Sequence, residues 1–337
     1  MKKTICVFFI TVLCLYCLMA MGYAADTEKL QWKEEWPQII KIGGGSIGGS
    51  GYIRAAAFGN VLKKEFPHLE VIVEQTKASV HNLKLVNEGQ VEIGMCASEV
   101  TYEAWQGIGA FEGEKYNNFR LLMPDSGDTY IYITKPEYNI NSVSEFNKKY
   151  CSLGSGSSND LAARKVFGDL NINVELINLP TADAVEAFKN GVIQGFSYGH
   201  PTPAIQELSL TTDIKILGLN EDEANIFMPL HSEFFYPSII PAGYYKGQTE
   251  EVKGLGHFNL SIVRADLPED CVYTILKAMF SNIDLVRDTW PALADVMSNE
   301  AEVSQSLKII AKGVPLHPGA VKYFKEMGFD VPDTGIY

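Results

Sequence analysis

Two glycine-rich turns are the segments of this sequence best suited to bind a ligand. The first, residues 43–51, reads Gly-Gly-Gly-Ser-Ile-Gly-Gly-Ser-Gly and lies between an apolar run at 39–42 and a helix-like stretch at 52–66. The second, residues 154–160, reads Gly-Ser-Gly-Ser-Ser-Asn-Asp and precedes a helix-like stretch at 161–170. Such turns present backbone N–H groups at a helix N-terminus, where the helix dipole favours an anion. Two of them predict two lobes that close on one small anionic ligand.

The first turn also matches a dinucleotide fingerprint, G-x-G-x-x-G, at Gly43, Gly45 and Gly48, with Glu74 near the end of the next strand-like run. The export signal described below argues against a nicotinamide cofactor, and no Gly-Lys-Ser or Gly-Lys-Thr ends the turn as in a P-loop. The six histidines are scattered without metal-ligand spacing, and no nucleophile elbow precedes a helix. We therefore expect no cofactor, no metal and no catalysis.

Strand-like and helix-like segments alternate along the chain, as in α/β proteins with parallel sheets and crossover helices. In the first half, strand-like runs are expected at 69–75, 91–96, 120–123 and 130–134, with helices at 79–87 and 99–106 and a turn at 124–128. In the second half, a strand at 174–178 and a helix at 182–190 follow the second glycine turn. A strand at 260–264 and a helix at 270–287 come later.

The two halves repeat the same order of glycine turn, helix, strand, helix, glycine and short strand. Gly89 and Gly191 end helices in corresponding places, as C-terminal glycines do. Thr181 is expected to cap the helix at 182–190. The parallel has no residue-level identity, but it favours two similar α/β lobes.

The segment 76–82, Thr-Lys-Ala-Ser-Val-His-Asn, ends a strand and opens a helix, so that Thr76 and Ser79 can cap the helix and also face a cleft. A simple capping role for Ser79 stays open. Aromatic side chains that could line a pocket are Tyr52, Tyr102, Trp105, Tyr130, Tyr132 and Tyr198, although most aromatics at such spacing belong to the core.

The N-terminus has the pattern of a secretory signal peptide. Met1-Lys2-Lys3 is a basic start, residues 5–21 are almost entirely apolar, and small residues lead to a cleavage site after Ala24 or Ala25. The alternative is a retained anchor helix, for which the apolar run is short. We expect a leader at residues 1–25 and a periplasmic location.

The composition excludes some partners. The chain has 28 Lys and Arg against 41 Asp and Glu, a formal net charge of −13, and loss of the leader removes Lys2 and Lys3 as well. So acidic a surface repels nucleic acid and anionic lipid. Outside the leader, Cys96, Cys151 and Cys271 are widely spaced, which is no disulfide framework, although one pair could form.

Eight short motifs in order resemble the TAXI-type solute receptors of tripartite ATP-independent periplasmic (TRAP) transporters, over nearly all of the mature chain. They are Gly45-Ser46-x-Gly48-Gly49-Ser50, Ser79-Val80-x-Asn82-Leu83, Gly89-x-Val91-x-Ile93-Gly94, Ser98-Glu99-Val100-x-Tyr102-x-Ala104, Gly154-Ser155-Gly156-Ser157, Pro201-Thr202-Pro203-Ala204-Ile205-Gln206-Glu207-Leu208, Ile240-Pro241-Ala242-Gly243-x-Tyr245-x-Gly247-Gln248 and Arg264-Ala265-Asp266-Leu267-Pro268-Glu269-Asp270.

The resemblance implies a type II periplasmic-binding-protein fold, an α/β architecture of two lobes with a ligand cleft and a hinge. Lobe I would comprise residues 38–126 and 240–337, and lobe II residues 127–239. It implies capture of a small organic anion (a dicarboxylate, a keto-diacid or an acidic amino acid such as glutamate) by a monomer. The receptor would deliver this ligand to integral-membrane TRAP permease subunits without covalent chemistry.

The resemblance also implies where the ligand contacts lie, at the two glycine turns, the helix start at Ser79, the residue Ser98 and the stretch before Pro201. With the cleft residues argued above and the two substitutions described next, the candidate ligand-binding residues are Ser46, Gly49, Ser50, Tyr52, Thr76, Lys77, Ser79, His81, Asn82, Ser98, Ser155, Ser157, Ser158 and Tyr198.

The sequence departs from the family pattern in three places. Lys77 replaces a usual glycine, His81 replaces a usual acid, and Tyr52-Ile53-Arg54 replaces a usual Tyr-Tyr-Pro. The first two changes make the rim of the first lobe more positive, which favours a ligand with two anionic groups. Two other classes stay open on the same scaffold, an exported enzyme and a sensor that serves no permease.

Overall fold

The computed structural model describes residues 29–332, so the leader expected at residues 1–25 lies outside the described part of the chain. Residues 29–31 belong to a separate N-terminal unit, and the fold described below begins at Trp32. Within residues 29–332, no helix is long and apolar enough to cross a bilayer.

The strands are β1 Ile39–Gly45, β2 Glu70–Gln75, β3 Ile93–Ala97, β4 Phe119–Thr134, β5 Tyr150–Cys151, β6 Leu176–Ile177, β7 Gly195–His200, β8 Lys215–Leu217, β9 Phe235–Ile240 and β10 Val252–Arg264. The helices are α2 Ser50–Glu65, α3 Ser79–Asn87, α4 Ser98–Gln106, α5 Ser158–Asp169, α6 Thr181–Lys189, α7 Pro203–Thr211, α8 Glu221–His231, α9 Glu269–Ser281, α10 Ile283–Thr289, α11 Pro291–Met297, α12 Glu300–Ile310 and α13 Pro318–Glu326. Three short 3₁₀ turns are η1 Gly109–Phe111, η2 Pro136–Tyr138 and η3 Val143–Glu145.

The strands form one ten-stranded sheet that contains two parallel groups with the same internal order. The first half-sheet is β2-β1-β3, in which β1 pairs in parallel with both neighbours. The second half-sheet is β6-β5-β7, in which β5 does the same. The helices α2 and α3 connect the first set and α5 and α6 the second, so the repeat expected from the sequence is present in the topology.

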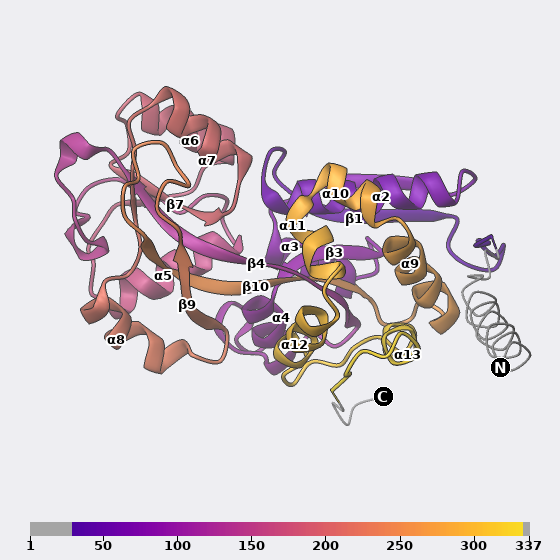
Figure 1. Ribbon diagram of the computed structural model, residues 1–337. Coiled ribbons are helices and arrows are strands. Elements are labelled where there is room, and N and C mark those ends of the chain that lie inside the picture. The colour runs from indigo at the N-terminus through magenta and orange to yellow at the C-terminus, as the bar shows by residue number, and fades with distance from the viewer. Residues whose placement is uncertain (1–28, 333–337) are drawn as a thin grey trace, which may run out of the picture. The chain divides into compact units, whose positions relative to one another are not determined.

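An antiparallel pair, β4 and β10, joins the half-sheets (Figure 1). β10 pairs with β3 on one side and β4 pairs with β7 on the other. The expectation of two strands separated by a turn at 124–128 is wrong, because β4 is a single strand through this segment. Two of its polar residues are buried and bonded to residues far along the chain: the carboxylate of Asp125 accepts from Arg54, and the carbonyl of Ser126 accepts from Asn259. Tertiary contacts thus override turn-forming sequence.

Two helix predictions also need correction. The helix expected at 270–287 is two helices, α9 and α10, that break at Asn282, whose side-chain amide bonds Glu65 and the Ala278 carbonyl. Thr181 is not a cap: α6 has Pro180 in the N-cap position and Thr181 as its first residue. The glycines Gly89 and Gly191 do have the positive φ angles, 71° and 70°, of a C-terminal glycine.

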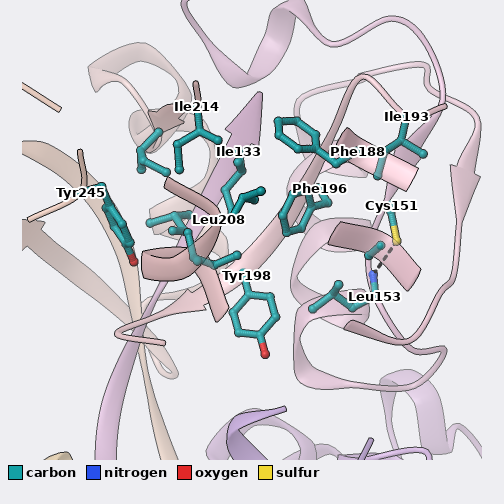
Figure 2. Close-up of a cluster of buried hydrophobic side chains, with 14 of the residues drawn as sticks. Ile133, Cys151, Leu153, Phe188, Ile193, Phe196, Tyr198, Leu208, Ile214 and Tyr245 are labelled. Atoms are coloured by element: carbon teal, nitrogen blue, oxygen red, sulfur yellow. Dashed lines mark hydrogen bonds between the residues drawn. The ribbon is translucent and has the colours of Figure 1, made fainter. Parts of the chain in front are cut away.

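Hydrophobic clusters lie on both sides of the second half-sheet. One gathers Ile133, Phe188, Phe196, Leu208 and their neighbours, as Figure 2 shows. The other includes further side chains of β4 with Val166 and Phe167 of α5. On the first half-sheet, α2 packs over β1 and β2, and the C-terminal helices α9 and α10 pack against α2. Within the described residues, Cys96, Cys151 and Cys271 are free and buried, so no pair forms among them.

Candidate functional site

A cavity of about 440 Å³ lies at the carboxyl ends of both sets of parallel strands. This is the edge at which open α/β sheets bind ligands, because the strand-to-helix turns meet there. Its walls are the turns β1–α2, β2–α3, β5–α5 and β6–α6, with Met95 from the middle of β3 and Tyr198 from β7. The cavity therefore draws on equivalent positions of the two half-sheets.

Four helices begin at this cavity, and three of them begin without a side-chain cap. The N-cap residues are Gly49 for α2, Ala78 for α3 and Pro180 for α6. Within the described chain, none of these three side chains accepts a hydrogen bond from the first turn of its helix. Only α5 is capped in this way, by Ser157, whose hydroxyl accepts from the Asp160 N–H at 3.2 Å. Uncapped N-termini leave backbone donors free for a ligand, and their dipoles favour negative charge.

Close packing of the backbone, in addition to unusual dihedral angles, explains why several positions of the first turn require glycine. A Cβ on Gly51 would lie 2.5 Å from the carbonyl oxygen of Gly44, and one on Gly44 would lie 2.9 Å from the Tyr52 Cα. Gly48, at φ 81°, takes the left-handed conformation that lets the turn reverse. The glycines let α2 begin directly against the end of β1, which brings its first N–H groups to the cavity wall.

The second turn is held by the Asp160 carboxylate. Its Oδ2 accepts from the Gly156 N–H at 3.0 Å. Its Oδ1 accepts from the Ser152 hydroxyl at 2.5 Å and from the Asn178 amide at 2.8 Å. Asn178 also donates to the carbonyl of Leu153 at 2.8 Å, so one buried carboxylate ties the β5–α5 and β6–α6 turns together.

The charge on the cavity wall is positive. Arg54 and Lys77 line it, whereas the part of the wall formed by the described residues contains no Asp or Glu. Lys77 is exposed at the rim, and Arg54 is 4% exposed. This distribution contrasts with the acidic composition of the chain and selects against a cationic ligand.

Hydroxyl groups provide most of the other polar lining. The Tyr198 hydroxyl points away from the hydrophobic cluster on which its ring packs (Figure 2), and the residue lines the cavity. Burial raises the pKa of the Tyr198 hydroxyl, so it stays protonated and can donate a hydrogen bond near neutral pH. Thr181 lies opposite the first turn: its Oγ1 would be 3.9 Å from a Cβ on Gly49.

Most of the candidate residues from the sequence line this one cavity. They are Ser46, Gly49, Ser50, Tyr52, Thr76, Lys77, Ser79, Ser155, Ser157, Ser158 and Tyr198. They come from both halves of the chain, as expected for two turns that face one ligand.

Three candidates lie elsewhere. His81 points back to its own turn, where its Nδ1 accepts from the Lys77 N–H at 3.3 Å. Asn82 is buried behind the wall: its amide donates to the carbonyls of Met95 and Gly44 at 2.7 and 3.2 Å, and its Oδ1 accepts from the Thr76 hydroxyl at 2.5 Å. It therefore positions the turns without lining the cavity.

Ser98, the third, is buried at the start of α4 and does not reach the cavity wall. The sequence motif around it begins just after β3 ends, and the β3 residue that lines the cavity is Met95, in the middle of that strand.

Five polar lining residues were missed as candidates: Arg54, Gln75, Asn159, Asn178 and Thr181. Arg54 entered the sequence analysis only as a departure from a family pattern, and Thr181 only as a helix cap. The signal for Arg54 was its place among Ala55, Ala57 and Phe58 on a helix that had to pack on a sheet. A buried arginine needs an acceptor, and Asp125 of the supposed turn is that acceptor, at 3.0 Å.

The two halves of the wall touch at the rim. The Val80 N–H at the start of α3 donates to the carbonyl of Gly156 in the second turn at 3.2 Å. Further out, Lys165 of α5 pairs with Glu103 of α4 at 2.6 Å, and the rings of Tyr102 and Phe234 lie 4.8 Å apart. These contacts hold segments of the two halves together beside the cavity.

Residues 42–328 match the model of the NMT1-like family. The chain belongs to the NMT1-like family. Among solved structures, this NMT1-like protein is similar to the periplasmic binding protein BugD, with 13% identity, 87% of this chain and 99% of that chain covered, and a TM-score of 0.53.

Two further structures show weaker likeness. The alkanesulfonate-binding protein SsuA from Xanthomonas axonopodis pv. citri, bound to MOPS, is 14% identical over 89% of this chain and 96% of that chain, with a TM-score of 0.48. An ancestral arginine-binding protein bound to arginine is 12% identical over 76% of this chain and 99% of that chain, with a TM-score of 0.47.

The similarity to BugD shows the fold alone: a mixed α/β periplasmic-binding-protein fold with a central sheet and flanking helices, which confirms the fold class expected from the sequence. In the described part of the NMT1-like chain, no group of three or more His, Cys, Asp or Glu side chains is arranged to hold a metal ion.

Proposed function

We propose that this chain is an exported, periplasmic solute-binding protein of the TAXI type that captures a small organic anion for a TRAP transporter. The observation that supports this most strongly is the convergence of three uncapped helix N-termini on one cavity, whose described wall carries two cations and no carboxylate. Uncapped N–H groups and helix dipoles together favour an anionic group over a neutral one.

The ligand class follows from what the wall offers. Carboxylates accept from backbone N–H groups, hydroxyls, Arg54 and Lys77, and the cavity volume of about 440 Å³ suits a small molecule. An α-ammonium group would find no carboxylate on the described wall, so a dicarboxylate or keto-diacid should bind better than glutamate. Neutral sugars would leave the helix N-termini without an anion.

Delivery to a membrane permease requires a receptor that opens and closes. We place the hinge near residues 125–130 and 236–243, in β4 and in β9 with the turn that follows it, between lobe I (38–126 and 240–337) and lobe II (127–239). The two turns would then move as parts of different lobes, and a bridging ligand would shift the equilibrium toward the closed form. We expect a monomer that works with integral-membrane TRAP permease subunits and performs no covalent chemistry.

The first experiment is a thermal-shift screen of glutarate, 2-oxoglutarate, glutamate, leucine and a hexose on the mature protein. A ligand present at 100 times its dissociation constant stabilises the folded state by about 2.7 kcal/mol, so the acids should raise the melting temperature clearly. Stabilisation by leucine or the sugar, with none from the acids, would contradict the proposal.

A second measurement separates a receptor from an enzyme. Mass spectrometry of the acid recovered after long incubation should show it chemically unaltered, and small-angle scattering should show a smaller radius of gyration with the acid than without it. Turnover of the acid would favour an exported enzyme instead. A sensor would bind the acid equally well, but no permease gene would lie beside its own.

A further inference from the structure

Arg54 is a buried cation with unused hydrogen-bonding capacity at the cavity. It is 4% exposed and lines the cavity wall, and its Nη1 donates to the Asp125 Oδ2 at 3.0 Å. Its Nε is buried and has no hydrogen-bond partner among residues 29–332. A guanidinium has five N–H donors, and a buried donor without an acceptor is unfavourable. An atom as buried as Nε is not reached from the cavity, so the part of the guanidinium left for an anionic group there is Nη2, which donates to no residue of the described chain.

The surroundings of Arg54 explain why its charge is only partly available. Asp125 is 3% exposed, and its second oxygen already accepts from the N–H and hydroxyl of Ser126. Asp128 is buried near the same arginine, where burial raises the pKa of its carboxyl and the charges of His257 and Arg54 act in the opposite direction. The Arg54 charge is thus shared with at least one buried carboxylate, and Asp125 is the direct competitor for it.

The two cations of the wall differ in depth. Arg54 is buried on α2, whereas Lys77 is exposed in the β2–α3 turn. A ligand with one anionic group cannot neutralise both equally, whereas an extended diacid can place one carboxylate at each.

We propose that Arg54 is a specificity-determining residue, which binds the buried carboxylate of an extended diacid while Lys77 faces the exposed one. Asp125 holds the guanidinium in place and limits its strength. This inference rests on the proposed function, because it assumes that the cavity takes an organic anion. It differs from a structural role for Arg54, in which the arginine would only neutralise Asp125 and anchor β4 to α2.

The two roles predict opposite responses to removal of the Asp125 charge. The test uses calorimetric titration of glutarate, a diacid, and pentanoate, a monoacid of the same length, into wild type and variants. Asp125→Asn keeps the side-chain volume and removes the competing charge, so it should tighten glutarate binding about three- to tenfold. Arg54→Met combined with Asp125→Asn removes both members of the buried ion pair, and it should weaken glutarate binding at least tenfold and abolish the preference over pentanoate.

Controls exclude a general effect of charge or folding. Arg287→Met combined with Asp295→Asn makes the same pair of changes at an exposed ion pair, and it should leave both affinities as in wild type. Circular dichroism melts report whether each variant folds. If the Arg54→Met double variant does not fold, Arg54→Lys carries the test: it keeps the charge but not the planar fork, so it should retain part of the diacid preference.

The outcomes separate this inference from the proposed function. One outcome would overturn the role of Arg54 and leave the proposed function intact. In it, wild type binds glutarate, Asp125→Asn binds glutarate no more tightly than wild type, and the double variant has the same glutarate affinity as Asp125→Asn. Wild type that binds neither glutarate nor pentanoate but binds a neutral ligand would overturn both. Tighter binding in Asp125→Asn and loss of diacid preference in the double variant would support the inference.

Discussion

The Asp160 carboxylate offers the sharpest test of how the second glycine turn is built. It is 2% exposed and accepts hydrogen bonds from the Gly156 N–H, the Ser152 hydroxyl and the Asn178 amide. The half-exposed side chain of Arg164 adds a bond at 3.0 Å. All of these groups act as donors, so the site needs a side chain that only accepts.

Asp160→Asn is nearly isosteric but places an NH₂ donor in this ring of donors. In its best orientation the amide nitrogen takes the place of Oδ2 and faces the Gly156 N–H, so that bond is lost. The bonds on the other oxygen change from charge-assisted to neutral. A hydrogen bond to a charged group contributes about 1.5–3 kcal/mol, and a buried donor left without an acceptor costs about 1–3 kcal/mol. The free energy of unfolding should therefore fall by about 2–4 kcal/mol, with little of this from the half-exposed Arg164 pair.

Urea unfolding followed by circular dichroism measures this change from the shift in midpoint. Asp183→Asn, an exposed carboxylate in the first turn of α6, is the matched control and should cost less than about 1 kcal/mol. Because the same carboxylate holds the cavity wall, Asp160→Asn should also weaken ligand binding. A loss of stability below about 1 kcal/mol, equal to that of the control, would refute the view that Asp160 organises the second turn.

Other substitutions test the remaining parts of the site and the fold. Burial lowers the pKa of His317 to about 4, below its unfolded value of about 6.5, so the unfolded state takes up the proton first. This group should thus leave the free energy of unfolding unchanged above pH 6.5 and lower it by up to about 3 kcal/mol as the pH drops toward 4. Urea titrations across this range should show a smaller loss of stability for His317→Asn than for wild type. Equal losses in the two proteins would contradict the assignment. Lys77→Gln should weaken glutarate binding about two- to fivefold in calorimetry, as expected for an exposed charge, while His81→Gln, outside the cavity, should leave it unchanged. Ser157→Ala should lower the free energy of unfolding by about 1 kcal/mol, because it removes the α5 cap, and it should also weaken glutarate binding. Ser155→Ala, at the exposed edge of the cavity, should weaken binding without a change in stability. Identical effects of the two substitutions would argue against the capping role of Ser157.

Local patterns carried most of the fold prediction. Glycine turns between an apolar run and a helical stretch mark the β1–α2 and β5–α5 connections, and the helix over residues 79–87 has the expected bounds. These features depend on residues close in sequence, so a single sequence is enough to find them.

The segment at 124–128 could not be assigned in the same way. Its Pro-Asp-Ser-Gly-Asp sequence has the composition of a turn, yet it continues as a strand. The compensation comes from residues far along the chain, since Arg54 binds the carboxylate of Asp125 and Trp290 donates to the hydroxyl of Ser126. The bounds of β4 therefore depend on tertiary contacts that sequence spacing does not reveal.

The candidate site shows the same division. Hydroxyls next to the glycines could be placed at the cavity because the turns themselves reach it. The sequence alone did not exclude His81 from the candidate ligand-binding residues. It lies two residues after Ser79 in the same helix, which places the two side chains on different faces of that helix. Asn82 lies three residues from Ser79 but turns toward the strand ends, where it bonds the carbonyl of Met95. Whether a side chain enters a cavity or supports its wall depends on which neighbours need its hydrogen bonds.

The equal topology of the two half-sheets hides an unequal division of chemistry. The first half contributes both cations of the described wall, Arg54 and Lys77, while the second contributes neutral donors such as Ser157, Thr181 and Tyr198. Charge acts at longer range than a hydrogen bond, so the first half would attract an anion before the second half reaches it. The hydroxyls and N–H groups of the second half can bond the ligand only when they are within about 3 Å of it. Closure would then depend on the hydrogen-bonding shape of the acid. The charged half would govern capture and the preference for a diacid, and the neutral half would govern which of the captured diacids is retained.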